Sequence, residues 1–394
     1  MSFSSQAIIS TEQTISNPIS DRALGLILGT AIGDALGIPY ECKKYDEIKK
    51  MRENQNFNEI IMKNANPFVK CKDHPFIPEN FKPGEYTDDT QLTLAMARAL
   101  HRFTNEMKNS KETNDDLSNQ DVFINRFMPL VVEEHVLEFK KSIIGWGGTK
   151  RAIQRLSEGT HDFKTSGNVG AKGNGVLMKL APLYLYYFHR VLKLTPGMSS
   201  TEGIHWIEKA SHEWMDEQLK TITIMTHNTE SCIITTCILV RFGLLVLLFG
   251  DQFVQHKGEI ISNLIDYCKE MENKFLNSAS HEISSRLQLL KDNLGVLHDD
   301  AILINVSNEG TYESVNSLIM VLGLILSVDS NVSQPFDLVL RAATIGGDCD
   351  SNAAMTGALI GAVFGKSALP HTFISHLIDH EMLIDEGKQF SLSL

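Results

Sequence analysis

Apolar residues recur along this chain at the spacing of helices, and no stretch shows the strict apolar–polar alternation of a half-exposed strand. Between residues 87 and 103, Leu92, Met96 and Phe103 belong to one apolar face, and Thr87 precedes that face as a helix cap. Further helical patterns cover residues 21–38, 121–139, 221–249 and 314–328. The pattern therefore predicts an all-α fold.

Two of the predicted helices carry glycine at every fourth position. This spacing places the glycines on one helical face, where a second backbone can approach closely, despite a cost of about 1 kcal/mol per glycine relative to alanine. The two faces are formed by Gly25, Gly29, Gly33 and Gly37 in one helix and by Gly357, Gly361 and Gly365 in the other. We hypothesise that these faces pack against each other.

The other segments divide the chain into a tail and one domain. Residues 1–20 are rich in Ser, Thr, Gln and Asn without periodicity, and we expect a flexible tail there. Residues 21–394 then form a single domain, in which 42–83 is interpreted as a short helix and a long surface loop. The charged, amphipathic stretch 251–313 is interpreted as outer helices or a helical insertion.

Composition limits the partners of this 394-residue chain. Apolar residues make up 43% and charged residues 21%, as in ordinary soluble globular proteins. The 36 basic and 48 acidic residues give a net charge of −12, which leaves no broad basic surface for a nucleic acid. An anionic ligand would therefore need metal ions, helix N-termini or glycine-rich loops.

Cysteine usage and the N-terminal sequence favour a cytoplasmic protein. The six cysteines have no Cys-x-x-Cys spacing and are expected to be reduced, and the N-terminus lacks the features of a secretory signal peptide. The apolar run 232–250 contains Arg241, which would cost about 2.5–3.5 kcal/mol at the centre of a bilayer, so we expect a buried core helix and no membrane span. A bacterial effector delivered into a host cell would show the same features.

Two groups of acids stand at predicted helix starts beside hydroxyl residues. Either group alone is explained by the favourable interaction of acids with a helix dipole. Two such groups in one chain favour a shared site for Mg2+, which binds carboxylates and keeps several waters. The groups are Thr87-Asp88-Asp89 and Asp348-Cys349-Asp350-Ser351, the second of which follows a Gly-Gly pair.

Two glycine-bearing segments, 144–151 and 167–182, are candidates for anion binding. Both could present backbone N–H groups to a phosphate at a helix start, but neither has the Lys-Ser/Thr ending of a P-loop, and a plain turn is the alternative for each. Further along the chain, His227 follows Thr226. From the residues alone it is interpreted as a partly buried histidine, because nothing nearby suggests a set of zinc ligands.

Five short blocks stand along the chain, and they include the acid groups and the second glycine-bearing segment. They are Gly-Asp-Ala-Leu-Gly-Ile-Pro-Tyr-Glu at 33–41, Tyr-Thr-Asp-Asp-Thr at 86–90, Gly-Asn-Gly-Val-Leu-Met-Lys-Leu-Ala-Pro at 173–182, Thr-His at 226–227 and Gly-Gly-Asp-Cys-Asp-Ser at 346–351. In this order, the blocks resemble the ADP-ribosylglycohydrolase family. The resemblance covers about residues 21–370 and implies one compact all-α domain around two Mg2+ ions.

The resemblance also implies roles for single residues. Glu41 and Asp348 are the implied catalytic residues. Ser351 stands where many members have Thr, which keeps the hydroxyl, and Lys172 is an uncommon side chain for its loop. The implied metal ligands are Thr87, Asp88, Asp89, Asp348, Asp350 and Ser351, and the residues implied to surround ADP-ribose are Gly147, Gly170, Lys172, Gly173, Asn174 and His227.

The function implied by the resemblance is Mg2+-dependent release of ADP-ribose from a modified protein side chain. The two ions would orient the ribose and act as Lewis acids, while Asp348 or Glu41 takes or returns a proton. An arginine linkage is preferred over a serine linkage, because the sequence blocks resemble the dinitrogenase reductase-activating branch more closely. The alternatives are hydrolysis of O-acetyl-ADP-ribose, a metal-dependent phosphohydrolase, and a non-catalytic relative that binds ADP-ribose or is structural. A monomer is expected.

Overall fold

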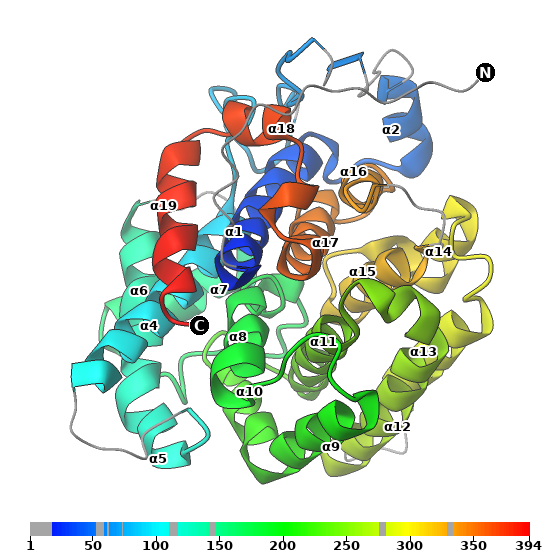
Figure 1. Cartoon of the computed structure of the whole chain (residues 1–394). Coiled ribbons are helices and arrows are strands. Elements are labelled where there is room, and N and C mark those ends of the chain that lie inside the picture. The colour runs from blue at the N-terminus through cyan, green and yellow to red at the C-terminus, as the bar shows by residue number, and fades with distance from the viewer. Residues whose placement is uncertain are drawn as a thin grey trace, which may run out of the picture.

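Helices form nearly all the regular structure of the described residues in this computed structural model (Figure 1). The structure describes residues 18–52, 59–60, 63–72, 74–109, 117–141, 147–275, 281–328 and 334–394. The predicted all-α fold is confirmed, with two short strands as its exception in these ranges. Most of the expected tail lies outside the described residues, and the first helix begins at Pro18, three residues before the predicted start at Asp21.

The α-helices of these ranges vary in length from 3 residues, at Gln120–Val122, to 22 residues, at Asp88–Asn109. In chain order they are α1 (Pro18–Gly37), α2 (Tyr45–Arg52), α4 (Asp88–Asn109), α5 (Gln120–Val122), α6 (Met128–Lys141), α7 (Gly147–Ser157), α8 (Ala181–Tyr186), α9 (Ser200–Ala210), α10 (Asp216–Ile224), α11 (Glu230–Phe249), α12 (Lys257–Phe275), α13 (Glu282–Asp292), α14 (Asp300–Val306), α15 (Ser314–Leu326), α16 (Asp337–Ala342), α17 (Cys349–Phe364), α18 (His371–His376) and α19 (His380–Ser391).

Shorter elements join these helices. The 3₁₀ turns are Ile38–Tyr40, Asn174–Val176, Gly250–His256, Asn308–Gly310 and Lys366–Ala368, and the π-helical turns are Phe123–Phe127, Tyr187–Val191 and Ser211–Met215. The strands β1 (Asn168–Val169) and β2 (His227–Asn228) pair in parallel, with Asn168 opposite His227. This pairing brings the second glycine-bearing segment beside the Thr226-His227 block.

Helices α1 and α17 lie side by side and antiparallel near the centre of the molecule (Figure 1). A methyl group on Gly29 would lie 2.2 Å from the carbonyl oxygen of Gly357, and one on Gly25 would lie 2.4 Å from that of Gly361. Both values are far below van der Waals contact, so the backbones touch and only glycine fits. The hypothesis that the two glycine faces pack together is confirmed.

Other helices cover this pair and complete one hydrophobic core. Helices α4, α8 and α19 pack on α1, while α11, α15 and α16 pack on α17. Helices α12, α13 and α14 lie outside α11 and α15, but their apolar residues Ile260, Leu287 and Leu303 belong to the same core. The stretch 251–313 is therefore an outer helical layer, and its interpretation as an insertion stays a prediction.

Two helical segments are long and apolar enough to cross a membrane by length and composition, Pro18–Tyr40 and Glu230–Phe275. Their most apolar windows are 94% and 100% buried inside the protein, as expected for core helices. Arg241, in the second segment, is buried and has polar partners. Its guanidinium donates to Asn263 Oδ1 at 2.8 Å and to Glu208 Oε1 at 3.1 Å.

The interpretation of 42–83 as a short helix and a surface loop is partly wrong. Helix α2 is the short helix, but Cys71, Ile77 and Phe81 are buried against Ile38 in a small cluster of their own. The apolar residues of this segment have no regular spacing, so sequence periodicity could not reveal the cluster. The segment thereby packs against the turn that leads to Glu41.

Candidate functional site

Two groups of carboxylates meet at one residue, Asp350. One oxygen each from Asp34, Asp89 and Asp350 lie within 4.8 Å of one another, and the same is true of Glu41, Asp348 and Asp350. The residues come from α1, from the first turn of α4, from the turn after Ile38–Tyr40 and from the start of α17. The two predicted acid groups are therefore brought together, as the sequence predicted.

The α1–α17 packing explains why Glu41 reaches this site. A methyl group on Gly37 would lie 2.4 Å from the Cα of Asp350, so the end of α1 rests directly on the first turn of α17. Glu41 follows four residues later. On the α17 side, Gly347 has a φ of +75°, and a side chain there would meet the carbonyl oxygen of Glu309 at 2.0 Å. The Gly-Gly pair thus fixes the turn that presents Asp348.

Asp34, which was not a candidate from the sequence, holds the start of α4 in place. Its two carboxylate oxygens accept hydrogen bonds from both the backbone N–H and the hydroxyl of Thr87 and of Thr90, at 2.7–3.1 Å. A carboxylate has about four acceptor positions, so these donors saturate Asp34. We infer that Asp34 positions the ligand groups instead of binding an ion itself.

The donor set of the site fits a hard divalent cation. Asp89 Oδ1 is buried and makes no hydrogen bond, which is exceptional for a buried carboxylate oxygen. The hydroxyl of Thr87 donates to Asp34 Oδ1 at 2.9 Å, and that of Ser351 donates to Asp89 Oδ2 at 3.3 Å. Both hydroxyl oxygens therefore keep lone pairs free for an ion. Oxygen donors of these kinds are the ligands that Mg2+ prefers.

Burial makes the ionised carboxylates costly. It raises the pKa of Asp34 to about 6, although the four hydrogen bonds act in the opposite direction. Burial, followed by the negative charges of neighbouring acids, raises the pKa of Asp89 and of Asp350 well above the usual range. A bound cation would relieve both the desolvation and the repulsion.

Asp348 does not act as a helix cap, which was one interpretation of the acids. It precedes α17, but its side chain makes no capping hydrogen bond. Instead Asp348 Oδ2 accepts from the Asn174 amide at 2.9 Å, and the same amide donates to Ser317 Oγ at 3.1 Å. Asn174, predicted to surround ADP-ribose, therefore also holds a carboxylate of the proposed metal site.

A cavity of about 580 Å³ opens beside the carboxylates. Its wall contains glycines from both candidate anion-binding segments, and the ring of His227 packs on them: methyl groups on Gly173 and Gly148 would lie 3.4 and 3.8 Å from His227 Nε2. Of the first segment, residues 144–146 lie outside the described residues. The lining includes Glu41, Thr87, Asp88, Asp89, Gly147, Gly148, Gly173, Asn174, Gly175, His227, Tyr312, Asp348, Asp350 and Ser351.

Two of the residues predicted to surround ADP-ribose do not line this cavity. Gly170 and Lys172 are both exposed and lie on the loop between β1 and the turn that begins at Asn174. Gly170 has a φ of +79°, so a turn accounts for that glycine. Conversely, Tyr312 lines the cavity without having been a candidate from the sequence. Gly148 and Gly175 line it from the two candidate segments, although neither was named as a single site residue.

His227 is neutral in this environment. Burial, with a smaller contribution from the positive charge of Lys179, lowers the pKa of His227 to about 3. Lys179 is fully buried, and burial lowers its pKa to about 7. The Lys179 ammonium donates to Thr226 Oγ1 at 3.3 Å, and this hydroxyl lies 3.0 Å from His227 Nδ1. His227 is thereby held with Nε2 toward the glycines, as a neutral hydrogen-bonding group.

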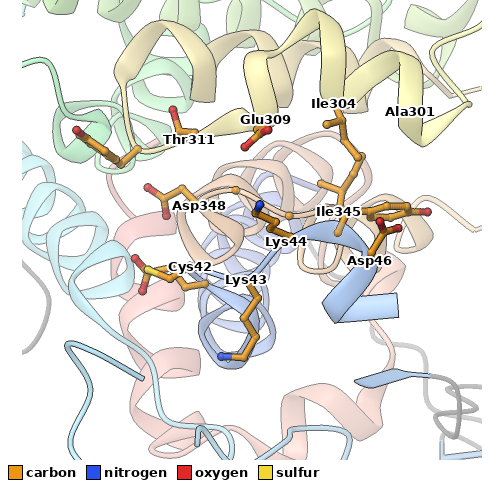
Figure 2. Close-up of a pocket in the computed structure, with 15 residues that line it drawn as sticks. Cys42, Lys43, Lys44, Asp46, Ala301, Ile304, Glu309, Thr311, Ile345 and Asp348 are labelled. Atoms are coloured by element: carbon orange, nitrogen blue, oxygen red, sulfur yellow. The ribbon is translucent and has the colours of Figure 1, made fainter. Parts of the chain in front are cut away.

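A second cavity, of about 600 Å³, adjoins the first (Figure 2). It lies between residues 42–46 and residues 301–311, and it shares Glu41, Cys42, Tyr312 and Asp348 with the first cavity. Glu41 and Asp348 therefore stand where the two cavities meet.

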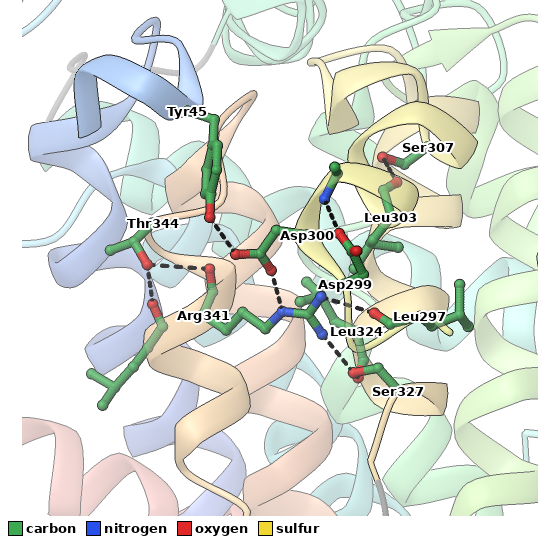
Figure 3. Close-up of polar contacts among 12 residues, drawn as sticks. Tyr45, Leu297, Asp299, Asp300, Leu303, Ser307, Leu324, Ser327, Arg341 and Thr344 are labelled. Atoms are coloured by element: carbon green, nitrogen blue, oxygen red, sulfur yellow. Dashed lines mark hydrogen bonds and ion pairs between the residues drawn. The ribbon is translucent and has the colours of Figure 1, made fainter. Parts of the chain in front are cut away.

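Polar contacts brace the outer wall of the second cavity (Figure 3). Asp300 of α14 accepts from the Tyr45 hydroxyl at 2.7 Å and from Arg341 Nε at 2.7 Å. The same guanidinium donates to Ser327 Oγ and to the carbonyl oxygen of Leu297, each at 2.8 Å. These bonds tie α2, α14 and α16 together around the cavity.

Known proteins resemble this chain in sequence and in structure. A model of the ADP-ribosylglycohydrolase family matches residues 16–390. A putative ADP-ribosyl glycohydrolase of Acanthamoeba polyphaga mimivirus is 22% identical over 93% of this chain and 93% of its own length. The ADP-ribosyl-[dinitrogen reductase] glycohydrolase of Rhodospirillum rubrum is 23% identical over 91% of each chain.

Two further comparisons extend these findings. The ADP-ribosylarginine hydrolase Tri1 of Pseudomonas putida is 23% identical over 90% of this chain and 73% of its own length. A solved structure described as an ADP-ribosylglycohydrolase-related protein complex shares the fold, with a TM-score of 0.55 and 19% identity over 95% of this chain and 99% of its own. Since the family model spans nearly the whole sequence, this chain belongs to the ADP-ribosylglycohydrolase family.

Proposed function

We propose that this protein hydrolyses the bond between ADP-ribose and an arginine side chain of a modified protein, with two Mg2+ ions as cofactors. The family acts by removing ADP-ribose from modified proteins. The observation that carries the finer proposal is the meeting of two carboxylate groups at Asp350, with Glu41 at the junction of two cavities. The name of one relative, the ADP-ribosylarginine hydrolase Tri1 of Pseudomonas putida, supports the arginine linkage.

The residues that would hold the ions are those named from the sequence. Asp350 belongs to both carboxylate groups and would be shared. When bound, Mg2+ supplies Lewis acidity and orients the oxygen atoms of a substrate. The proposed ligand set is Thr87, Asp88, Asp89, Asp348, Asp350 and Ser351, all of which line the first cavity.

The first cavity is suited to the ADP-ribose part of the substrate. The N-terminus of α7, at Gly147 and Gly148, and the glycines Gly173 and Gly175 can offer backbone N–H groups to the pyrophosphate, whereas the N–H of Asn174 between them donates to the carbonyl oxygen of Tyr312. His227 adds a neutral hydrogen-bonding group at the same wall. An acidic protein can bind an anionic ligand in this way, without a broad basic surface.

The second cavity is suited to the arginine. Its charged lining contains the lysines Lys43 and Lys44 and the acids Glu41, Asp46 and Glu309, besides Asp348, which is assigned to the proposed metal site. The three other acids outnumber the two lysines, so the balance favours a cationic guanidinium over the neutral oxygen of serine.

Glu41 is the better candidate for proton transfer. Asp348 Oδ2 is occupied by the Asn174 amide, whereas the Glu41 side chain is 21% exposed at the junction of the cavities. In the proposed reaction, a water oxygen bonds to C1″ of the ribose and the bond from C1″ to the arginine nitrogen breaks. Glu41 takes the proton of the water and returns it to the leaving nitrogen, a role typically worth about 10²- to 10⁴-fold in rate.

A panel of defined arginine-linked, serine-linked and O-acetyl-ADP-ribose substrates tests this function. We expect intact ADP-ribose from the arginine substrate, loss of release in EDTA and recovery with Mg2+. Asp350→Asn should abolish release, whereas Asp385→Asn, at an exposed acid of α19, should not. AMP as the product, exclusive cleavage of another linkage, or binding without release in any sample would contradict the proposal.

A further inference from the structure

The histidine nearest to Glu41 lies in the segment that the sequence suggested was a surface loop. His74 Nε2 is 2.8 Å from Glu41 Oε2, and the His74 side chain is only 1% exposed. Glu41 lies in the turn after Ile38–Tyr40, 33 residues earlier in the chain. The two segments are held together by the buried cluster of Ile38, Cys71, Ile77 and Phe81.

The backbone around His74 fixes which ring nitrogen carries the hydrogen. Nδ1 accepts from the backbone N–H groups of Phe76 and Ile77, each at 3.2 Å. A nitrogen that accepts hydrogen bonds has no hydrogen of its own, so the neutral ring must carry it on Nε2. The N–H group that results faces the Glu41 carboxylate.

This N–H group is buried and has no other partner. Nε2 makes no hydrogen bond of normal geometry, so at 2.8 Å the Glu41 oxygen must lie off the N–H axis. A buried donor without a partner is rare and costly. Hydrogen bonds of catalytic groups are often misaligned before the substrate binds, and they tighten in the complex. A small rotation of the Glu41 side chain would align this one.

We propose that His74 is a positioning residue for Glu41. Its Nε2–H group donates to Glu41 Oε2 in the substrate complex, which directs the other carboxylate oxygen toward the attacking water. Glu41 needs such an anchor, because Asp348 and Asp350 lie close by and repel its charge. The structural part of this inference stands on the contacts of His74, and its catalytic consequence rests on the proposed function.

NMR spectroscopy of protein containing ¹⁵N-labelled histidine tests the structural part without any activity measurement. His74→Gln identifies the His74 signals by their loss. We expect Nδ1 without hydrogen, hydrogen on Nε2, and a shift of the Nε2 signal in Glu41→Gln. Hydrogen on Nδ1, or no response to Glu41→Gln, would overturn the inference whether or not the protein is an enzyme.

Kinetics of the arginine substrate test the catalytic part. His74→Leu, which cannot donate, should lower kcat by about 10- to 100-fold, the usual range for a hydrogen bond to a charged group, with KM and ADP-ribose affinity unchanged. His74→Gln keeps an N–H donor and should recover most of this loss. His161→Gln, at an exposed histidine whose ring contacts the hydroxyl of Thr160, serves as the control.

The outcomes separate the two proposals. An equal loss in His74→Leu and His74→Gln, or a change in KM alone, would show a structural role for His74 and overturn the inference. No ADP-ribose release by the unaltered protein would instead contradict the proposed function, and the NMR result would still decide whether His74 holds Glu41.

Discussion

The glycines between α1 and α17 and the glycines of the first cavity differ in what surrounds them. The α1–α17 seam is formed by Gly25, Gly29 and Gly33 on α1 and by Ala353, Gly357 and Gly361 on α17. A methyl group added to any of these glycines would meet backbone atoms at 1.9–2.4 Å. In the cavity wall, formed by Gly147, Gly148, Gly173 and Gly175, the nearest atoms belong to side chains or are absent within 4 Å.

This difference predicts that substitutions in the seam change the stability of the protein, whereas substitutions in the cavity wall change ligand binding. Backbone atoms inside two packed helices cannot move without shifting both helices, whereas side chains at a cavity can rotate. The seam should therefore control the fold and the distance between Glu41 and Asp350, and the wall should control how a ligand fits. Substitutions in each region test that separation.

The largest effect is expected from Gly29→Ala. Its methyl group would lie 2.2 Å from the carbonyl oxygen of Gly357, so the helices must move apart. We expect the free energy of unfolding to fall by about 3 kcal/mol or more, at or above the upper end for overpacking, and Mg2+ binding to weaken as well. Urea denaturation measures the first effect.

Gly258→Ala is the matched control, because no atom lies within 4 Å of the added methyl group in α12. Its free energy of unfolding should be unchanged or rise by up to about 1 kcal/mol. Equal effects of the two substitutions would contradict the role given to the seam.

The sequence predicted the seam and the acid groups because both are encoded locally. A four-residue spacing of glycine determines which helical face can approach a second backbone, and adjacent acids such as Asp88 and Asp89 stand out at a helix start. The family resemblance then added Glu41. The glycine spacing and the adjacent acids can be recognised without knowing which segments contact each other in the fold.

The sequence could not predict partners that depend on irregular backbone. Asp34 is a single acid within an apolar helix, and only the fold shows that Thr87 and Thr90 saturate it. His74 lies in a segment without periodicity, so its contact with Glu41 has no local signal. The family resemblance implied that Gly170 surrounds ADP-ribose, but the positive φ of its exposed turn is enough to explain a glycine there. Whether Gly170 contacts a ligand therefore stays a prediction.

The second prediction concerns the carboxylates at the end of the seam. Asp89 and Asp350 have pKa values raised by burial and by neighbouring charges, so the folded protein keeps protons that the unfolded chain loses above about pH 4. Without metal, the melting temperature should therefore fall as the pH rises from 5 to 8. Mg2+ at about 100 times its Kd should add about 2.7 kcal/mol. At one fixed concentration of Mg2+, the stabilisation should be larger at about pH 8, where the carboxyls are ionised and the Kd is lower, than at about pH 5.

Thermal unfolding in EDTA and in Mg2+ across this pH range measures the effect. Asp350→Asn should reduce both the pH dependence and the stabilisation by Mg2+, since it removes one of the site carboxyls whose pKa is raised. A melting temperature in EDTA that stays constant or rises with pH would contradict this account of the site.

The third prediction concerns Asp34→Asn. An amide has one acceptor oxygen where four donors of Thr87 and Thr90 converge, so the start of α4 should lose its fixed position. We expect Mg2+ affinity to fall by about 10- to 100-fold, as for other residues that orient metal ligands. Calorimetric titration measures this affinity, with Asp385→Asn as the control. Unchanged affinity would restrict Asp34 to a role in helix packing.

The smallest effect is expected from Gly148→Ala in the cavity wall. The added methyl group would lie 3.8 Å from His227 Nε2, an ordinary contact, so the free energy of unfolding should change by less than about 0.5 kcal/mol. The same methyl group enters the space proposed for the pyrophosphate, and ADP-ribose affinity should fall by about 5-fold, or about 1 kcal/mol. Titration with ADP-ribose, beside Gly258→Ala, separates the two effects. A loss of stability without a loss of affinity would mean that the wall, like the seam, serves the fold.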